Sequence, residues 1–152
     1  MTELLTMIKP WAFKHRKDIS DSLKYCGQLI QIEEIQVPEK LLRFLYGRFE
    51  GQLFYELMVS DLVNREGTVA IYEGDIARFA ELKKEIRKIF DPLLPLNTNN
   101  VGYTRNCIHT SDSLDAAARE VNFTRNLLTR ISRLQPTATT LRLQPTDVIW
   151  HK

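Results

Sequence analysis

The chain has 152 residues, which is most simply one domain, and a chain of this size can bury an apolar core without disulfides or metals. Its net charge of +2 is too small to indicate nucleic acid or a membrane surface as a partner. The two cysteines, Cys26 and Cys107, match no metal-ligand spacing and predict reduced thiols. No apolar run reaches the length of a membrane span and no secretory signal precedes the first predicted strand, so we expect a cytoplasmic protein.

Residues 3–9 form a short apolar run, which predicts a buried strand. Pro10 has no N–H to donate to the ladder, so the strand must end before it. Lys9 should therefore lie at the strand end, where its ammonium group can reach a bound phosphate, unless it is simply a surface lysine.

Periodic apolar residues predict a helix over 17–25, a strand over 29–37, helices over 38–46 and 53–64, a strand over 68–72 and a helix over 75–90. The basic residues near the end of the 75–90 helix are expected on its outer face: Lys83, Lys84, Arg87 and Lys88.

The stretch from residue 105 to 128 concentrates chemically useful side chains. A short strand is predicted over residues 105–108, with the apolar Cys107 and Ile108 at its end, and His109 follows it. The Ser-Asp-Ser run at 111–113 precedes a helical pattern over 114–128, and such residues cap a helix by accepting hydrogen bonds from free backbone N–H groups. We therefore expect His109 at the lip of a strand, beside a helix start that suits a phosphate. Glu120 on that helix can fold back toward the imidazole, although a lone histidine here is also typical of simple packing.

The motif Asn106-x-x-His109-x-Ser-Asp-Ser, followed by Ala-Ala and Arg-Glu, closely resembles the active-site segment of nucleoside diphosphate kinases. That family usually has glycine after the histidine, where this chain has Thr110. The resemblance extends over residues 3–128. It implies the α+β class with a ferredoxin-like βαββαβ core, a four-stranded antiparallel sheet covered by helices. The order of the predicted strands and helices fits the same fold independently.

The resemblance also implies an activity. The γ-phosphate of a nucleoside triphosphate would pass to a nucleoside diphosphate by a ping-pong mechanism through a phospho-histidine. By resemblance, His109 is the nucleophile, Glu120 orients it and Ser111 supports Glu120. Mg²⁺ is implied as a cofactor that rides on the nucleotide phosphates, with no metal ligands from the protein. The implied partners are nucleoside di- and triphosphates and further copies of the chain, in a dimer at least.

Nucleotide-binding residues are implied from several elements. Lys9, Tyr46 and Asn106 would contact phosphate or sugar oxygens, and Arg87 is predicted as a further nucleotide-binding residue. Phe54 would stack on the nucleobase, with Tyr103 closing the other side, and such stacking is worth about 1–3 kcal/mol per base with little base preference. Without the resemblance, Tyr46 and Phe54 are equally well interpreted as core aromatics at helical spacing.

Residues 91–104 depart most from the family pattern. Their Pro, Asn and Gly content predicts a loop, which is shorter than the family loop and lacks the threonine and arginine that hold phosphates there. Phe90 stands in the place of that threonine. Gapless counting puts Lys84 in the place of the family's helix arginine, whereas Arg87 takes it after a local shift, and Arg48 or Arg87 is a candidate substitute for the loop arginine. Since phosphoryl transfer depends on positioning and charge, two hypotheses remain: an active, divergent kinase, or a catalytically weakened nucleotide-binding or scaffolding member.

Residues 129–152 are predicted to form a basic C-terminal arm outside a kinase-like domain at residues 1–128. Ile149 and Trp150 near its end favour docking on the domain or on a neighbouring subunit. Nucleic-acid binding through this arm is a third and less favoured hypothesis. The sequence leaves base preference open, and also the choice among dimer, tetramer and hexamer.

Overall fold

The structure, a computed structural model, describes residues 1–95 and 105–134. Its strands and helices follow the predicted order β-α-β-α-α-β-α-β-α. The strands are β1 (Thr2–Ile8), β2 (Gly27–Gln36), β3 (Glu66–Gly74) and β4 (Ile108–Thr110), and the helices are α1 (Arg16–Leu23), α2 (Glu39–Tyr46), α3 (Leu53–Leu62), α4 (Ile76–Phe90) and α5 (Leu114–Leu134). Short 3₁₀ helices lie between them: η1 (Pro10–His15), η2 (Gly47–Phe49) and η3 (Asp91–Leu93).

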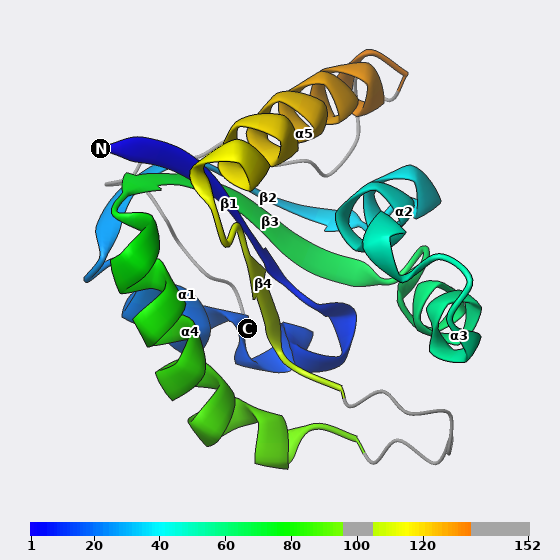
Figure 1. Cartoon of the computed structure of the whole chain (residues 1–152), viewed down its shortest axis with the longest axis horizontal. Helices are drawn as coiled ribbons and strands as arrows, with labels where there is room; N and C mark the ends of the chain where they lie inside the picture. The colour runs from blue at the N-terminus through cyan, green and yellow to red at the C-terminus, as the bar shows by residue number, and fades with distance from the viewer. Residues whose placement is uncertain (96–104, 135–152) are drawn as a thin grey trace.

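The described strands form a four-stranded antiparallel sheet in the order β2-β3-β1-β4. Helix α5 crosses one side of the sheet, α1 and α4 lie together on the other, and α2 and α3 form a pair at one end (Figure 1). The predicted α+β class and ferredoxin-like βαββαβ core are therefore confirmed, with the α2–α3 pair inserted between β2 and β3.

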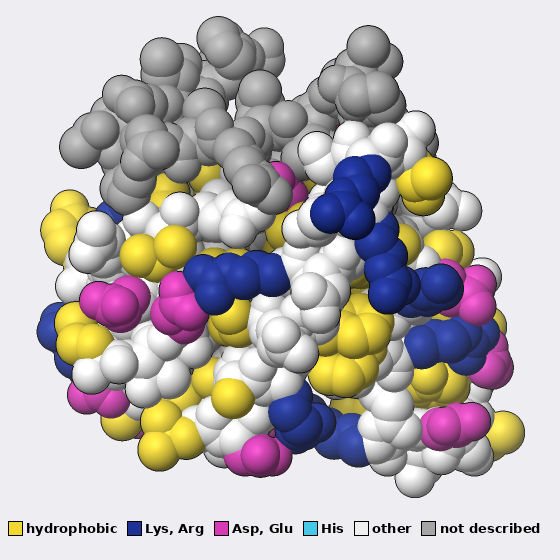
Figure 2. Space-filling view, turned by 90° about the horizontal axis from the view of Figure 1, so that it is seen from above, with side chains coloured by type: hydrophobic (Ala, Val, Ile, Leu, Met, Phe, Trp, Pro, Cys, Tyr) yellow, Lys and Arg dark blue, Asp and Glu magenta, His cyan; other side chains and the backbone are white. Residues whose placement is uncertain are grey.

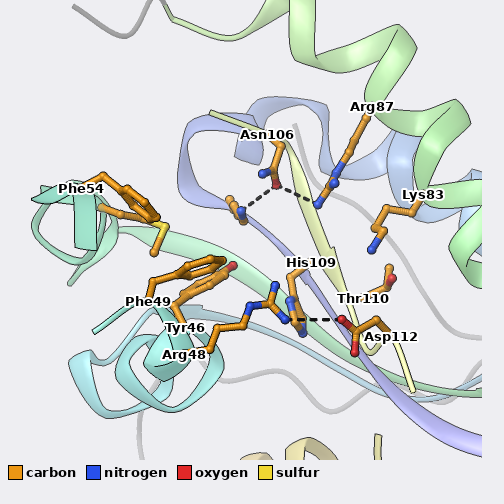
Figure 3. Close-up of a pocket in the computed structure, with 12 residues that line it drawn as sticks. Tyr46, Arg48, Phe49, Phe54, Lys83, Arg87, Asn106, His109, Thr110 and Asp112 are labelled. Carbon is orange, nitrogen blue, oxygen red and sulfur yellow. Dashed lines mark hydrogen bonds and ion pairs between the residues drawn. The ribbon is translucent and has the colours of Figure 1, made fainter. Parts of the chain in front are cut away.

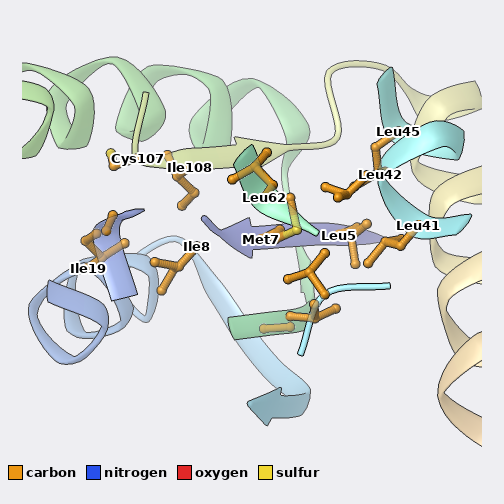
Figure 4. Close-up of a cluster of buried hydrophobic side chains, with 14 of the residues drawn as sticks. Leu5, Met7, Ile8, Ile19, Leu41, Leu42, Leu45, Leu62, Cys107 and Ile108 are labelled. Atoms are coloured by element: carbon orange, nitrogen blue, oxygen red, sulfur yellow. The ribbon is translucent and has the colours of Figure 1, made fainter. Parts of the chain in front are cut away.

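Strand β1 is the centre of the hydrophobic core. Leu4, Leu5, Met7 and Ile8 are at most 1% exposed. Figure 4 shows Leu5 and Met7 turned toward the α2–α3 pair, and Ile8 turned toward Ile19 of α1. A strand that is covered on both faces carries a continuous apolar run instead of an alternating one. Because β1 is held from both sides, the residue that follows it has a fixed position at the strand end.

An aromatic stack joins α2 to α5. The rings of Phe44 and Phe123 lie 4.1 Å apart between centroids and within 3° of parallel. They line a groove together with Lys40, Arg119 and Arg130, and Figure 2 shows hydrophobic side chains between lysine and arginine side chains on this side of the molecule. Such a pair adds about 0.5–1.5 kcal/mol beyond its buried area. The stack therefore helps to fix the C-terminal end of α2 relative to α5.

Strand β4 begins later than predicted. It starts at Ile108 and includes His109, which pairs with Met7 of β1. The expectation that His109 lies at the lip of a strand is therefore wrong, because the ladder with β1 continues to Thr110. His109 gains a rigid backbone from this pairing on one side.

Helix α5 ends later than predicted, at Leu134. Leu127 and Leu128 are buried and Ile131 packs against the core, so the apolar face continues past residue 128. The predicted division between a domain at 1–128 and an arm at 129–152 falls inside this helix. It stays a prediction, since residues 135–152 lie outside the described residues. None of the described helices combines the length and apolar character that crossing a membrane requires.

Gly27→Ala is expected to lower the free energy of unfolding by about 2 kcal/mol. A Cβ atom at Gly27 would lie 2.5 Å from the backbone oxygen of Glu73, which the ladder between β2 and β3 holds in place. Gly47→Ala is the matched control, because a Cβ there meets nothing within 4 Å and the φ angle of −56° suits alanine. Urea unfolding followed by circular dichroism measures both variants. An equal loss in the two proteins would contradict the steric explanation.

Candidate active site

The predicted site residues gather at a pocket beside β4, the edge strand of the sheet. The pocket has a volume of about 270 Å³ and lies between α4 and the α2–α3 pair (Figure 3). Its lining residues are Lys9, Tyr46, Arg48, Phe49, Phe54, Met58, Lys83, Arg87, Asn106, His109, Thr110 and Asp112. Glu120 and Ser111 lie behind His109, whereas Tyr103 lies outside the described residues.

His109 presents one ring nitrogen to a carboxylate and leaves the other available. Nε2 lies 2.8 Å from Oε1 of Glu120, and the His109 side chain is 14% exposed. An ionised carboxylate only accepts hydrogen bonds, so Nε2 carries the proton and Nδ1 keeps a free lone pair. Burial lowers the pKa of His109 below its usual value, although hydrogen bonding to Glu120 raises it in opposition. The imidazole is therefore neutral near pH 7, as a nucleophile must be.

Ser111 fixes the carboxylate behind the histidine. It is fully buried, and its hydroxyl donates to Oε1 of Glu120 at 2.8 Å. The same hydroxyl oxygen accepts the backbone N–H of Leu5 at 3.0 Å, which ties the start of α5 to the central strand. Ser113 caps α5 by accepting the backbone N–H of Ala116 at 3.0 Å, as the predicted helix start requires. The fold thus brings His109, Glu120 and Ser111 together as predicted, and their catalytic roles stay predictions.

Lys9 is a buried cation that faces the pocket. It is 3% exposed, and its Nζ donates to Oδ1 of Asn106 at 2.6 Å. The ammonium group also lies 5.1 Å from the ring centroid of Tyr46. Burial, and then the guanidinium group of Arg87, lowers the pKa of Lys9 to about 7. A negatively charged ligand would reverse that shift, because it favours the protonated form.

Arg87 is the helix arginine that reaches the pocket. Its Nη2 donates to Oδ1 of Asn106 at 3.2 Å and to the backbone oxygen of Ile108 at 2.9 Å. Lys84, the alternative from gapless counting, is 67% exposed and pairs with Glu81. The Asn106 amide oxygen accepts from both Lys9 and Arg87, so its NH₂ group remains as a donor for a ligand oxygen.

Lys9→Met is expected to change how stability depends on pH. In the unfolded chain the pKa of this lysine returns to about 10.4, whereas in the folded protein it is about 7. Above about pH 7 the unfolded state binds more protons, so the free energy of unfolding rises with pH by up to about 1.4 kcal/mol per pH unit. Lys9→Met should flatten this rise between about pH 7 and 8.5, as denaturant titrations at several pH values would show. Lys84→Met should keep it, and an unchanged slope in Lys9→Met would contradict the buried-cation assignment.

The two predicted aromatics line the pocket in different ways. Tyr46 is 5% exposed, and its ring meets that of His109 edge to face with 6.0 Å between centroids. Burial raises the pKa of its hydroxyl, which finds no hydrogen-bond partner among the described residues. Phe54 is half-buried and packs at 5.3 Å against Phe49. Tyr46 is therefore both a core residue and a pocket residue, while Phe54 has an exposed part that suits a flat ligand.

Several lining residues did not follow from the sequence pattern. Lys83, like Arg87, is half-buried in the pocket and not on the outer face of its helix, which corrects the sequence interpretation of both. Its spacing of four from Arg87, one helical turn, is the signal that would have found it. Arg48, considered above as a substitute cation, does line the pocket and pairs with Asp112 at 3.5 Å across its mouth (Figure 3). Phe49 completes the aromatic wall.

Known sequences were compared with the chain in two ways, against family models and against individual proteins. No protein-family model matches the chain. A nucleoside diphosphate kinase of Staphylococcus aureus (strain MSSA476) is 30% identical over 133 residues, which cover 80% of this chain and 86% of that protein. A nucleoside diphosphate kinase of Methanobrevibacter smithii is 27% identical over 127 residues, covering 76% of this chain and 81% of its own.

Solved structures resemble the fold. The nucleoside diphosphate kinase of Aquifex aeolicus superposes with a TM-score of 0.63 at 20% identity, covering 81% of this chain and 94% of that one. A halophilic nucleoside diphosphate kinase from Halobacterium salinarum, solved in complex with CDP, gives a TM-score of 0.55 at 22% identity and covers 79% of this chain and 84% of that one.

Proposed function

Because this chain belongs to the nucleoside diphosphate kinase family, we propose that it transfers the γ-phosphate of a nucleoside triphosphate to a nucleoside diphosphate through phosphorylated His109. The observation that carries this proposal is the placement of the His109 ring between Glu120 and the pocket. Nε2 is held by Glu120 at 2.8 Å, and the ring lines a pocket that cations surround.

The proposed chemistry has two matching halves. In the first, the Nδ1 lone pair of His109 attacks the γ-phosphorus in line, an N–P bond forms, and the bond to the β–γ bridging oxygen breaks, which releases a nucleoside diphosphate. The proton on Nε2 stays in place, and Glu120 stabilises the positive charge that develops on the ring. In the second half, a terminal oxygen of another nucleoside diphosphate attacks the phosphoryl group, and the lone pair returns to Nδ1. This is ping-pong catalysis.

Binding roles follow from the lining residues. Lys9 and Arg87 are proposed to neutralise the phosphates, and Asn106 to donate its NH₂ group to a ligand oxygen. Phe54 is proposed to stack on the base, with Phe49 beside it, as the 5.3 Å ring contact allows. Tyr46 is proposed to donate its unpaired hydroxyl to a phosphate or sugar oxygen.

Magnesium is proposed to enter with the nucleotide. Among the described residues no group of three His, Cys, Asp or Glu side chains is placed to hold a metal, and Asp112 is the acidic side chain of the described pocket wall. Such a donor set fits Mg²⁺ that keeps phosphate oxygens and water as ligands. Bound in this way, the ion would supply positive charge to the bridging and terminal phosphate oxygens.

The second candidate is a catalytically weakened member that binds nucleotides without transferring phosphate. It is favoured by the sequence of residues 91–104, which contains no lysine or arginine. Arg105 does not replace the loop arginine, since its guanidinium lies 5.1 Å from the ring centroid of Trp11 and 3.5 Å from Asp61. The assembled His109, Glu120 and Ser111 favour the active enzyme, because a scaffold has no need of an oriented nucleophile.

Incubation with γ-labelled ATP and magnesium distinguishes the two candidates. An active kinase becomes labelled through a bond that is stable in alkali and labile in acid, as a phosphoramidate is. Addition of an unlabelled nucleoside diphosphate should then remove the label and produce labelled triphosphate. Nucleotide binding by calorimetry without any label would support the weakened member instead.

The remaining proposals concern assembly and location. A homo-oligomer of at least two copies is proposed from family membership, and gel filtration with light scattering would test it. Nucleic acid is not proposed as a partner. A cytoplasmic location is proposed from the free thiols Cys26 and Cys107.

A further inference from the structure

Lys83 occupies the α4 side of the pocket, one helical turn before Arg87. It is half-buried and lines the same pocket as His109. Figure 3 shows its ammonium group pointing into the pocket, toward the region between Arg87 and Asp112. Within the described part of the chain Lys83 forms no hydrogen bond or ion pair. No hydrogen bond or ion pair of the described residues therefore explains why this ammonium group lies in the pocket.

The described pocket wall carries more positive charge than it can neutralise. Lys9, Arg48, Lys83 and Arg87 are cationic, whereas Asp112 is the acidic side chain among the described lining residues and already pairs with Arg48. Burial, and then the nearby Arg87, lowers the pKa of Lys83, so its charged form is less favoured than that of a free lysine. Like charges placed together in this way are stabilised by an anionic ligand, and a triphosphate is such a ligand.

A further cation near the transferring phosphate has to come from α4, because the loop that follows this helix carries no lysine or arginine. No lysine or arginine occurs between Lys88 and Arg105. Lys88 is 72% exposed and pairs with Glu85, and Arg105 is directed at Trp11 and Asp61. Lys83 is placed differently, because it lines the same pocket as His109, whose pKa is lowered by burial and further by the charges of Lys9 and Lys83.

We propose that Lys83 is a catalytic residue that contacts the transferred phosphoryl group from the α4 side, opposite Lys9, and supplies the charge that the shortened loop does not carry. This rests on the proposed kinase function. Charge on the equatorial oxygens of the transferring group would lie between the two lysines. A donor aimed at developing charge is worth about 10²–10³-fold in kcat.

The test compares Lys83→Ala with Lys84→Ala, which removes the same charge one residue along, where the side chain is 67% exposed and paired with Glu81. The rate of His109 labelling by γ-labelled ATP is measured in a single turnover at saturating nucleotide. Lys83→Ala is expected to slow labelling about 10²-fold. Lys84→Ala should stay within about 2-fold, as surface pairs contribute little. Lys83→Arg should recover most of the rate, because it restores the charge.

Thermal unfolding of Lys83→Ala checks that the variant is folded and gives a readout that a structural lysine would not give. Its melting temperature should rise, because burial of the ammonium group and its repulsion from Arg87 outweigh its attraction to Asp112 and Glu120. Equal labelling rates for Lys83→Ala and Lys84→Ala would overturn the proposal.

A second measurement distinguishes failure of the proposed kinase function from failure of the proposed Lys83 contact. If the unsubstituted protein takes no label, binding of inorganic triphosphate is measured by calorimetry on the same variants. The missing label contradicts the kinase function, and a loss of triphosphate affinity of about 10-fold or more in Lys83→Ala alone, the size expected for one charged hydrogen bond, would still support Lys83 as a ligand of the terminal phosphate. Unchanged triphosphate binding would overturn that contact as well.

Discussion

His109→Ala is expected to abolish labelling by γ-labelled ATP and to lower phosphoryl transfer by at least about 10⁴-fold. The substitution removes the only atom of the pocket wall that the proposed mechanism uses as a nucleophile, and Glu120 is left with no group to orient. The backbone of residue 109 keeps its pairing with Met7, so the fold should survive. Coupled assays of triphosphate formation and gel-based labelling measure the effect.

A matched control is available in His15, which packs at 5.5 Å against Phe90 and is not among the residues that line the pocket. His15→Gln should keep both labelling and turnover within about 2-fold of the unsubstituted protein. ADP binding by calorimetry should persist in His109→Ala, since Lys9 and Arg87 remain. Label retained in His109→Ala would mean that another residue carries the phosphoryl group.

Glu120→Gln is expected to lower the transfer rate by about 10²–10³-fold while ADP affinity stays nearly unchanged. Glutamine keeps the size of the side chain and an oxygen that accepts from Ser111 and from Nε2 of His109. It removes the negative charge that stabilises the ring as Nδ1 becomes bonded to phosphorus. The loss should therefore appear in kcat rather than in KM.

The pH profile of Glu120→Gln gives a second signature with a defined sign. Glu120 raises the pKa of His109 against the effect of burial. Removing its charge lowers that pKa further, so the acidic limb of the rate profile should move to lower pH. Glu81→Gln, on the exposed side of α4, should leave rate and profile unchanged. A shift of the acidic limb to higher pH would contradict the assignment of Glu120 as the partner of the nucleophile.

The helix arginine illustrates where sequence reasoning stopped. Gapless counting favoured Lys84 and a local shift favoured Arg87, and the loop that separates them from His109 differs in length from the family loop. A change of one residue turns a side chain by roughly 100° around a helix. Packing of Phe79, Ile86 and Phe90 into the core fixes the rotation of α4. That rotation puts Arg87 and Lys83 at the pocket.

Strand β4 illustrates a second limit. In the sequence, His109 stands between apolar residues and the residues that cap a helix. A strand that ends before the histidine and a strand that includes it both give this local pattern. The extent of the strand depends on its partner, and β1 pairs with β4 through Thr6, Met7 and Ile8, which lie 100 to 104 residues before their partners in the sequence. No local signal reports how far such a long-range ladder continues.

The sequence by itself determined the order of strands and helices, the fold class and the group formed by His109, Ser111 and Glu120. These depend on short-range periodicity and on a motif that spans fifteen residues. Lys9 was also predicted at the site. Only the tertiary structure decided between Lys84 and Arg87 and brought Lys83 and Arg48 to the pocket, because these side chains reach it through helix rotation and chain packing. The physical reason is that side-chain direction in a helix or at a strand end is fixed by what the opposite face buries, and that is a property of the whole packed chain.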